Sequence, residues 1–146
     1  HVSKKPQAIS HAQAAGVPLA ALTAQQSLFD FAGLTSGQVT LIHAGAGGVG
    51  GWAIQLAKIK GATVISTASA ANHEYVKSLG ADVVIDYRNQ NFVDEVLKLH
   101  PNGVDVVFDT VGGDTQKESW KVVKENGVLV SIVSAPDAEQ GKAKNI

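Results

Sequence analysis

The 146-residue chain contains no cysteine and no methionine. Without cysteine it can form neither a disulfide nor a thiolate metal site, and it has no redox-active thiol. This composition is compatible with a reducing compartment, and we expect a cytoplasmic protein. Because methionine is also absent at position 1, we expect the chain to be a processed or excised piece of a longer protein.

An excess of charge of one sign is also lacking. The net charge of −1 gives no electrostatic basis for binding nucleic acid or an anionic membrane. No apolar run is long enough to span a bilayer, and no apolar signal-peptide region follows the N-terminal lysines. A hydrophobic content of 45% with 17% charged residues instead indicates a packed domain rather than a disordered chain.

Two helices are predicted before the first strand. Ser10 and Gln13 form a capping-box pattern that begins a short helix, which Gly16 ends. Pro18 suits the first turn of a second helix, expected over residues 19–31. The positions expected to be buried in this second helix are Leu22, Leu28, Phe29 and Phe31.

Strands and helices then alternate along the chain. Near-continuous apolar runs predict strands that helices cover on both faces, at 39–43, 63–67, 83–86, 104–109 and 128–133. Helices are predicted between them at 48–60, 72–79, 93–99 and 115–124, the last with Asp114 as its N-cap. Repeated strand–helix units indicate an α/β fold with a parallel, doubly wound sheet.

A glycine-rich segment connects the first of these strands to its helix. This context makes a GxGxxG pattern a credible dinucleotide site, although a ligand-free turn is the alternative. Gly45 is expected to permit the tight turn, Gly47 to let a pyrophosphate approach the backbone, and Gly50 to let the helix pack close to the sheet. The helical N–H groups of Gly48 and Val49 would then face the phosphates.

The expected architecture is therefore a Rossmann-type sheet of about five strands in the order 3-2-1-4-5. A complete fold of this kind has six strands, so the sixth is missing. Residues 1–36 form an N-terminal helical segment, 37–134 the dinucleotide-binding domain, and 135–146 a loop or disordered tail. Without a sixth strand, 128–133 would be an exposed edge, and we expect the chain to form a homo-oligomer through it.

NADP(H) is favoured over NAD(H) as the cofactor. NAD-binding folds place an acid after the second strand to hold the ribose 2′-hydroxyl, but here no acid precedes Glu74. The groups expected near a 2′-phosphate are Thr67, Ser69, Asn72, Tyr87 and Arg88. Thr67 and Ser69 can equally be ordinary loop residues, and Asn72 a helix N-cap. After the fourth strand, Thr110 and Val111 are expected to bind the cofactor, and Gly112 and Gly113 would let its ribose or nicotinamide approach the backbone, although a plain loop is the alternative.

No metal site and no catalytic residue can be assigned. The five histidines have no metal-binding spacing, and neither HExxH nor GxSxG occurs. His43 is interpreted as a half-buried strand residue. Asp86 and Asp109 end strands, where they can contact ribose hydroxyls or simply stabilise turns.

Segments 16–24, 46–50, 79–82, 84–87 and 108–112 resemble the quinone oxidoreductase (zeta-crystallin) branch of the medium-chain dehydrogenase/reductases. Gly45 departs from the family pattern, which prefers Ser or Ala there. The resemblance implies an NADPH-dependent reductase of quinones, enones or alkenals, with Thr23 near the nicotinamide and Tyr87 near the 2′-phosphate. Leu19 stands where zinc-dependent relatives carry a zinc-ligand cysteine, so no catalytic zinc is expected.

The resemblance also implies a substrate domain and a sixth strand that the chain does not contain. We therefore expect an isolated cofactor-binding domain that binds NADPH but turns nothing over. A small-molecule substrate is expected to bind in the full-length enzyme. Two alternatives remain open. One is a nucleotide-sensing or interaction module without catalysis, and the other is an enoyl-reductase module of a larger synthase.

Overall fold

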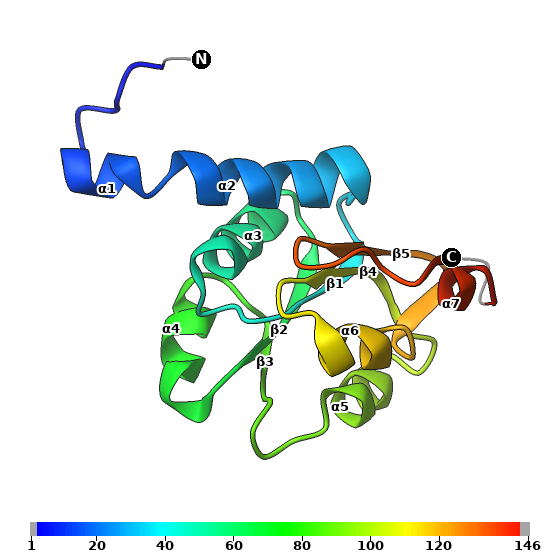
Figure 1. Ribbon diagram of the computed structural model, residues 1–146. Helices are drawn as coiled ribbons and strands as arrows, with labels where there is room; N and C mark the ends of the chain where they lie inside the picture. Colours follow the sequence, from blue (N-terminus) through cyan, green and yellow to red (C-terminus); the bar gives the residue numbers. More distant parts are fainter. Residues whose placement is uncertain (1–2, 144–146) are drawn as a thin grey trace.

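Five parallel strands form a single sheet at the centre of the computed structural model, which describes residues 3–143 (Figure 1). The strands are β1 (Val39–Ile42), β2 (Thr63–Ala68), β3 (Val83–Asp86), β4 (Val104–Asp109) and β5 (Val123–Ser131). Their order is β3-β2-β1-β4-β5, and every pairing is parallel. The predicted fold class and strand order are therefore confirmed.

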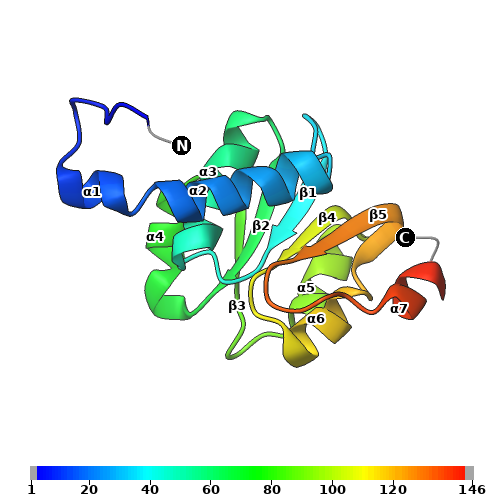
Figure 2. The same cartoon turned by 45° about the horizontal axis from the view of Figure 1, so that its top comes forward.

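Helices cover both faces of the sheet (Figures 1 and 2). On one side lie α2 (Pro18–Gln25), the π-helix η1 (Gln26–Phe31), α3 (Gly48–Ile59) and α4 (His73–Ser78). On the other side lie α5 (Phe92–Leu99) and α6 (Gly113–Ser119). The remaining elements are α1 (His11–Ala15), the 3₁₀ turn η2 (Ala70–Asn72) and α7 (Ala138–Ala143). No helix within residues 3–143 combines the length and apolarity that crossing a membrane requires.

Two apolar clusters hold these layers together. Successive strand residues point to opposite faces, so Ile42 packs with α3 while its neighbour Leu41 packs with α5. Both side chains are fully buried, and such burial contributes about 1.5–3 kcal/mol for each. Double coverage of this kind explains why the strands read as continuous apolar runs.

The helix predicted over residues 19–31 changes geometry part-way. It is α-helical to Gln25 and then π-helical to Phe31, where the Ala32 amide donates to Ser27 at 3.0 Å. Leu28 is fully buried, as predicted, and Phe29 packs partly against the core. The predictions for Leu22 and Phe31 were wrong, because these side chains are 52% and 74% exposed. The wider π turn moves Phe31 off the face that Leu28 buries, whereas Leu22 precedes this turn and lies on the exposed face of α2.

The C-terminal third also differs from its prediction. The N-cap of α6 is Gly112, at φ 76°, and not Asp114, which instead pairs with Lys117 in the first turn of the helix. The helix ends at Ser119 because Trp120 and Val122 turn into the second apolar cluster, and β5 starts at Val123. Residues 138–143, expected as loop or disorder, form α7, while 144–146 lie outside the described residues.

Candidate cofactor-binding site

The glycine-rich turn joins β1 to α3 at the carboxyl end of the sheet. Its left-handed residue is Ala44, at φ 52°, and not Gly45 as the expected turn role implied. Gly45 lacks a side chain for a different reason, because a Cβ there would lie 2.2 Å from Ser66 Oγ on β2. The turn is closed by the Gly47 amide, which donates to the Ala44 carbonyl at 2.9 Å. Close packing, rather than unusual backbone angles, therefore dictates Gly45.

The other three glycines divide into one inward and two outward positions. A Cβ on Gly50 would lie 2.3 Å from the Ala44 carbonyl oxygen, so the expected close packing of α3 is confirmed. Gly47 and Gly48 are exposed, and a Cβ on Gly48 would meet nothing within 4 Å. Outside the turn there is consequently room for a ligand beside the first N–H groups of α3, which have no intrahelical acceptor. A pyrophosphate fits this cradle sterically and electrostatically.

A cavity of about 480 Å³ opens beside the turn, and we call it the His43 pocket. Its lining residues lie at or just beyond the carboxyl ends of β1 to β4, or belong to α5 and α6: His43, Ala44, Thr67, Tyr87, Phe92, Val111, Asp114, Thr115 and Glu118. Three of the predicted cofactor residues meet here, namely Thr67, Tyr87 and Val111. Aromatic and aliphatic walls with a few polar groups suit a planar heterocycle.

Two hydroxyl groups among the predicted cofactor residues, of which only that of Thr67 lines this pocket, already form hydrogen bonds within the protein. Thr67 Oγ1 accepts the Ala44 amide at 3.1 Å and lies 3.2 Å from His43 Nδ1. Thr110 Oγ1 donates to the His43 carbonyl at 2.8 Å. Both hydroxyls therefore stabilise the segment that follows β1, by hydrogen bonds to His43 and Ala44.

The residues predicted for a 2′-phosphate lie at the outer edge of this region. Ser69 is half-buried and accepts from Asn72 Nδ2 at 3.1 Å, and Asn72 makes no side-chain N-cap bond. The Arg88 guanidinium lies 5.8 Å from the centre of the Tyr87 ring, and both side chains are exposed. An exposed guanidinium and an exposed phenol are thus available together.

The strand-end aspartates stabilise turns. Asp86 accepts from Asn89 Nδ2 at 2.6 Å and from the Arg88 amide at 3.2 Å. These two hydrogen bonds, that from Asn89 first, hold the pKa of Asp86 below its ordinary value. Burial raises the pKa of Asp109, but hydrogen bonds led by those from the Gly112 and Val111 amides outweigh it and lower that pKa. Each carboxylate is therefore ionised, and its hydrogen bonds stabilise the turn that follows its strand.

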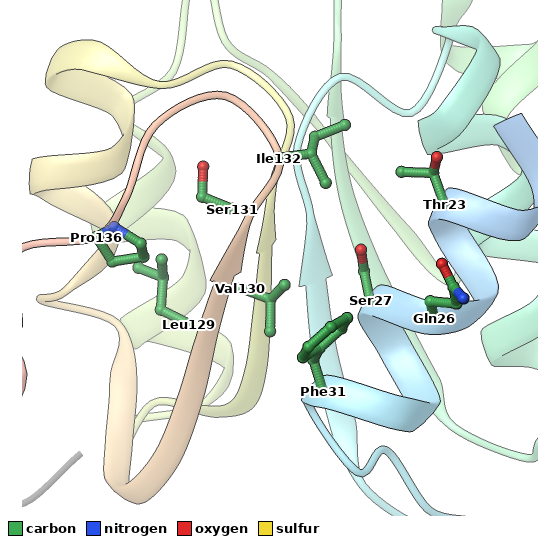
Figure 3. A pocket seen from close by; sticks show the side chains of 9 residues that line it. All are labelled: Thr23, Gln26, Ser27, Phe31, Leu129, Val130, Ser131, Ile132 and Pro136. Carbon is green, nitrogen blue, oxygen red and sulfur yellow. The ribbon is translucent and has the colours of Figure 1, made fainter. Parts of the chain in front are cut away.

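A second cavity, of about 440 Å³, lies between the α2–η1 segment and β5, and we call it the Thr23 pocket (Figure 3). Thr23, Gln26, Ser27 and Phe31 line one side in Figure 3, and Leu129, Val130, Ser131, Ile132 and Pro136 line the other. None of these side chains carries a formal charge. The pocket therefore offers amide and hydroxyl groups within an apolar wall.

Much of this second pocket was not predicted. Of its residues only Thr23 was singled out, on the basis of the family resemblance. Ser131 and Ile132 were expected inside a strand over 128–133. Because β5 ends at Ser131, they lie instead at its carboxyl end, where the rule that ligands lie beyond strand ends would have indicated them. No sequence signal identified Gln26 and Ser27, because their orientation depends on the π-helical turn.

The residues present do not fit a zinc site. The chain has no cysteine, and within residues 3–143 no three His, Asp or Glu side chains gather closely enough to hold a metal ion. Leu19, at the position of the zinc-ligand cysteine in zinc-dependent relatives, is 83% exposed on α2. The described residues therefore offer no ligand set for a catalytic zinc ion.

The fold and the glycine-rich turn define a doubly wound α/β domain of the kind found in oxidoreductases. Residues 48–145 match the family model described as zinc-binding dehydrogenase, and the chain belongs to this family of the medium-chain dehydrogenase/reductases. The family resemblance drawn from the sequence is confirmed.

Curated relatives match nearly the whole chain. It is 39% identical, over all of its length, to the zebrafish (Danio rerio) synaptic vesicle membrane protein VAT-1 homolog, of which it covers 30%. It is 44% identical, over 90% of its length, to the chloroplastic NADPH-dependent alkenal/one oxidoreductase of Arabidopsis thaliana, of which it covers 32%. The chain thus spans about a third of the length of these relatives.

Solved structures share the fold. The CurK enoyl reductase superposes with a TM-score of 0.89 at 36% identity, over 97% of this chain and 44% of that one. The Escherichia coli quinone oxidoreductase, solved in complex with NADPH, gives a TM-score of 0.85 at 33% identity, over 95% of this chain and 45% of that one.

Proposed function

We propose that the chain binds NADPH along the carboxyl edge of its sheet. The adenosine half would occupy the His43 pocket, the pyrophosphate would lie against Gly47 and Gly48, and the nicotinamide would reach the Thr23 pocket. The observation that carries this proposal is the open space at Gly48, beside the free N–H groups that begin α3. The NADPH complex of the E. coli relative supports it.

The charge pattern supports NADPH rather than NADH. The chain carries no acid from Thr67 to His73, so a 2′-phosphate would meet no carboxylate after β2. Arg88 would supply the cation, with Tyr87 and Ser69 as hydroxyl donors. Asn72 would contribute its amide once it exchanges its bond to Ser69 for one to phosphate. Thr67, the fifth residue predicted for this group, would not contact the phosphate, because its hydroxyl bonds to Ala44 and His43.

In the whole protein, we propose reduction of a quinone, enone or alkenal without zinc. Bound NADPH would supply a hydride from nicotinamide C4, and the protein would supply orientation. Thr23 and Gln26 would donate or accept hydrogen bonds at the carboxamide, while Phe31 and Ile132 would exclude water from one side of the ring. The chain alone would bind the cofactor and turn nothing over.

Calorimetric titration with NADPH and NADH tests the cofactor. We expect NADPH to bind at least tenfold more tightly, and Arg88→Gln to remove most of that preference while leaving NADH binding unchanged. Lys77→Gln, which removes an exposed cation of α4, is the matched control. Equal affinities would overturn the choice of NADPH, and no binding of either nucleotide would overturn the whole proposal.

A second candidate function is an enoyl-reductase module of a larger synthase, which the similarity to the CurK enoyl reductase favours. Both candidate enzymes would use the same cofactor-binding domain, so measurements on this domain alone do not distinguish them. Assaying the whole protein with an α,β-unsaturated thioester and with a quinone does separate them. Turnover of neither, with NADPH still bound, would favour a nucleotide-sensing module.

We also propose that the chain self-associates through β5. This strand pairs only with β4 in the described sheet, and Ile132 and Val133 beyond its end are 41% and 54% exposed. Sedimentation equilibrium would show a dimer that Ile132→Lys weakens. A wild-type monomer at high concentration would contradict this.

A further inference from the structure

Building on the proposed function, we infer that His43 is a positioning residue that fixes the glycine-rich turn for the adenosine half of the cofactor. It does so through a chain of hydrogen bonds with one direction, from Ala44 through Thr67, His43 and Ser119 to the carbonyl of Thr115.

The direction of this chain follows from the number of protons available. Ser119 Oγ donates its single hydrogen to the Thr115 carbonyl at 2.6 Å, so it must accept from His43 Nε2, 2.9 Å away. A neutral imidazole whose Nε2 carries the proton has an unprotonated Nδ1, which accepts from Thr67 Oγ1 at 3.2 Å. Every polar atom then has a partner of the right kind.

The other end of the chain is the glycine-rich turn itself. Thr67 Oγ1 donates to His43, which leaves its lone pairs to accept the Ala44 amide at 3.1 Å. Ala44 is the turn residue held in the left-handed region, at φ 52°, a conformation that costs a non-glycine residue free energy. The Thr67 hydroxyl therefore anchors the residue whose conformation most needs support.

The imidazole is held rigidly in this role. It is 1% exposed, and the ring of Phe92 meets it edge to face, with 4.8 Å between centroids and 84° between planes. Desolvation lowers the pKa of His43 to about 4, despite the opposing effect of the Asp109 charge. Asp114 and Glu118 line the same pocket without engaging the ring in any described hydrogen bond.

One pair of matched substitutions tests this inference. Thr67→Val removes the central hydroxyl of the chain, whereas Thr40→Val removes a hydroxyl on β1 that is equally buried but has no hydrogen-bond partner among the described residues. The affinity of each variant is measured for two fragments of NADPH. Adenosine 2′,5′-bisphosphate would fill the His43 pocket, and nicotinamide mononucleotide probes the nicotinamide half of the site.

We expect Thr67→Val to weaken binding of the bisphosphate roughly tenfold, to leave the mononucleotide unaffected, and to be rescued by Thr67→Ser. Thr40→Val should bind both as the wild type does. If Thr67→Val lowers only the melting temperature, with the affinity of the folded protein unchanged, the hydroxyl is merely structural and the inference fails. Ser119→Ala, which breaks the chain at its far end, provides a second variant if Thr67→Val does not fold.

A measurement without ligand separates this inference from the proposed function. Nitrogen-15 NMR of labelled histidine should show His43 as the neutral Nε2–H tautomer from pH 5.5 to 8, and Ser119→Ala should abolish that preference. A charged ring or an Nδ1–H tautomer would overturn the hydrogen-bond chain. Failure of the wild type to bind any nucleotide overturns the proposed function and the positioning role, while NMR still decides the chain of bonds.

Discussion

Ser131 donates its hydroxyl hydrogen to Asp109 Oδ2 at 2.8 Å and so ties the end of β5 to the end of β4. The same fully buried carboxylate accepts the amides of Val111 and Gly112 at 2.9 and 2.8 Å, and Gln116 Nε2 at 3.0 Å. Val111 lines the His43 pocket and Ser131 the Thr23 pocket. One carboxylate therefore fixes the relative positions of both cavities.

Replacing this carboxylate should be costly. Asp109→Asn places an amide NH₂ against the donors from Gln116 or Ser131, and we expect a loss of about 3 kcal/mol in the free energy of unfolding. Urea denaturation measures it. Asp114→Asn, an isosteric change at an exposed carboxylate that pairs with Lys117, should leave the urea midpoint unchanged. Equal midpoints for the two variants would contradict the role of Asp109.

Two glycines of one turn should respond oppositely to alanine. Gly50→Ala forces a Cβ to within 2.3 Å of the Ala44 carbonyl, so we expect a loss of at least about 2 kcal/mol of stability. Gly48→Ala meets no atom and replaces a poor helix former, so stability should stay equal or rise by about 0.5 kcal/mol. Its added methyl group should nevertheless weaken NADPH binding roughly tenfold if phosphate occupies that space. Unchanged affinity would place the pyrophosphate elsewhere.

The stability of the protein should depend on pH through His43. Its folded-state pKa of about 4 lies below the ordinary value of 6.5, so between these values the unfolded state binds more protons. Stability should therefore be constant above about pH 7 and fall as the pH drops toward 4, by about 3 kcal/mol in total. Urea denaturation from pH 7.5 to 4.5 measures the slope.

The matched control for that pH dependence is His43→Gln, which cannot titrate. This variant will be less stable at every pH, so its slope, not its absolute stability, is compared with that of the wild type. A slope as steep as the wild-type slope would show that another group is responsible.

Asp82 should matter more than its ion-pair partner. Lys58 Nζ lies 2.8 Å from Asp82 Oδ1, but Asp82 Oδ2 also accepts the Val64 amide of β2 at 2.7 Å. Because the pair is more than a third exposed, Lys58→Met should cost no more than about 0.5 kcal/mol. Asp82→Ala leaves the amide without its acceptor and should cost about 1–2 kcal/mol. Equal losses, measured by thermal denaturation, would contradict this difference.

Regular features of the fold could be predicted because they follow local rules. The capping box at Ser10 and Gln13, and the strands over 83–86 and 104–109, lie where the sequence placed them. Apolar continuity specified the strands, and their alternation with helices specified the parallel order. These signals depend only on residues close together in the sequence.

What sequence reasoning missed depends on distant contacts. His43 was interpreted as half-buried, yet it is fully buried because Thr67, Phe92 and Ser119 approach it from three separate elements. Thr67 was offered as a phosphate donor, but its hydroxyl faces inward for the same reason. The assignments of Ser69, Asn72 and Arg88 to a phosphate stay predictions, since a local pattern cannot specify which atoms a ligand reaches.

The π-helical segment Gln26–Phe31 makes the shape of the Thr23 pocket depend on the length of the chain. A π turn is equivalent to an α-helix into which one residue has been inserted. Deleting one residue between Ser27 and Phe31 would let the segment relax to an α-helix and rotate everything on one side of the cut by about 100°. Gln26 and Ser27 would then lose their register with β5. A change of one residue in the length of this segment would therefore displace the Gln26 and Ser27 wall of the Thr23 pocket.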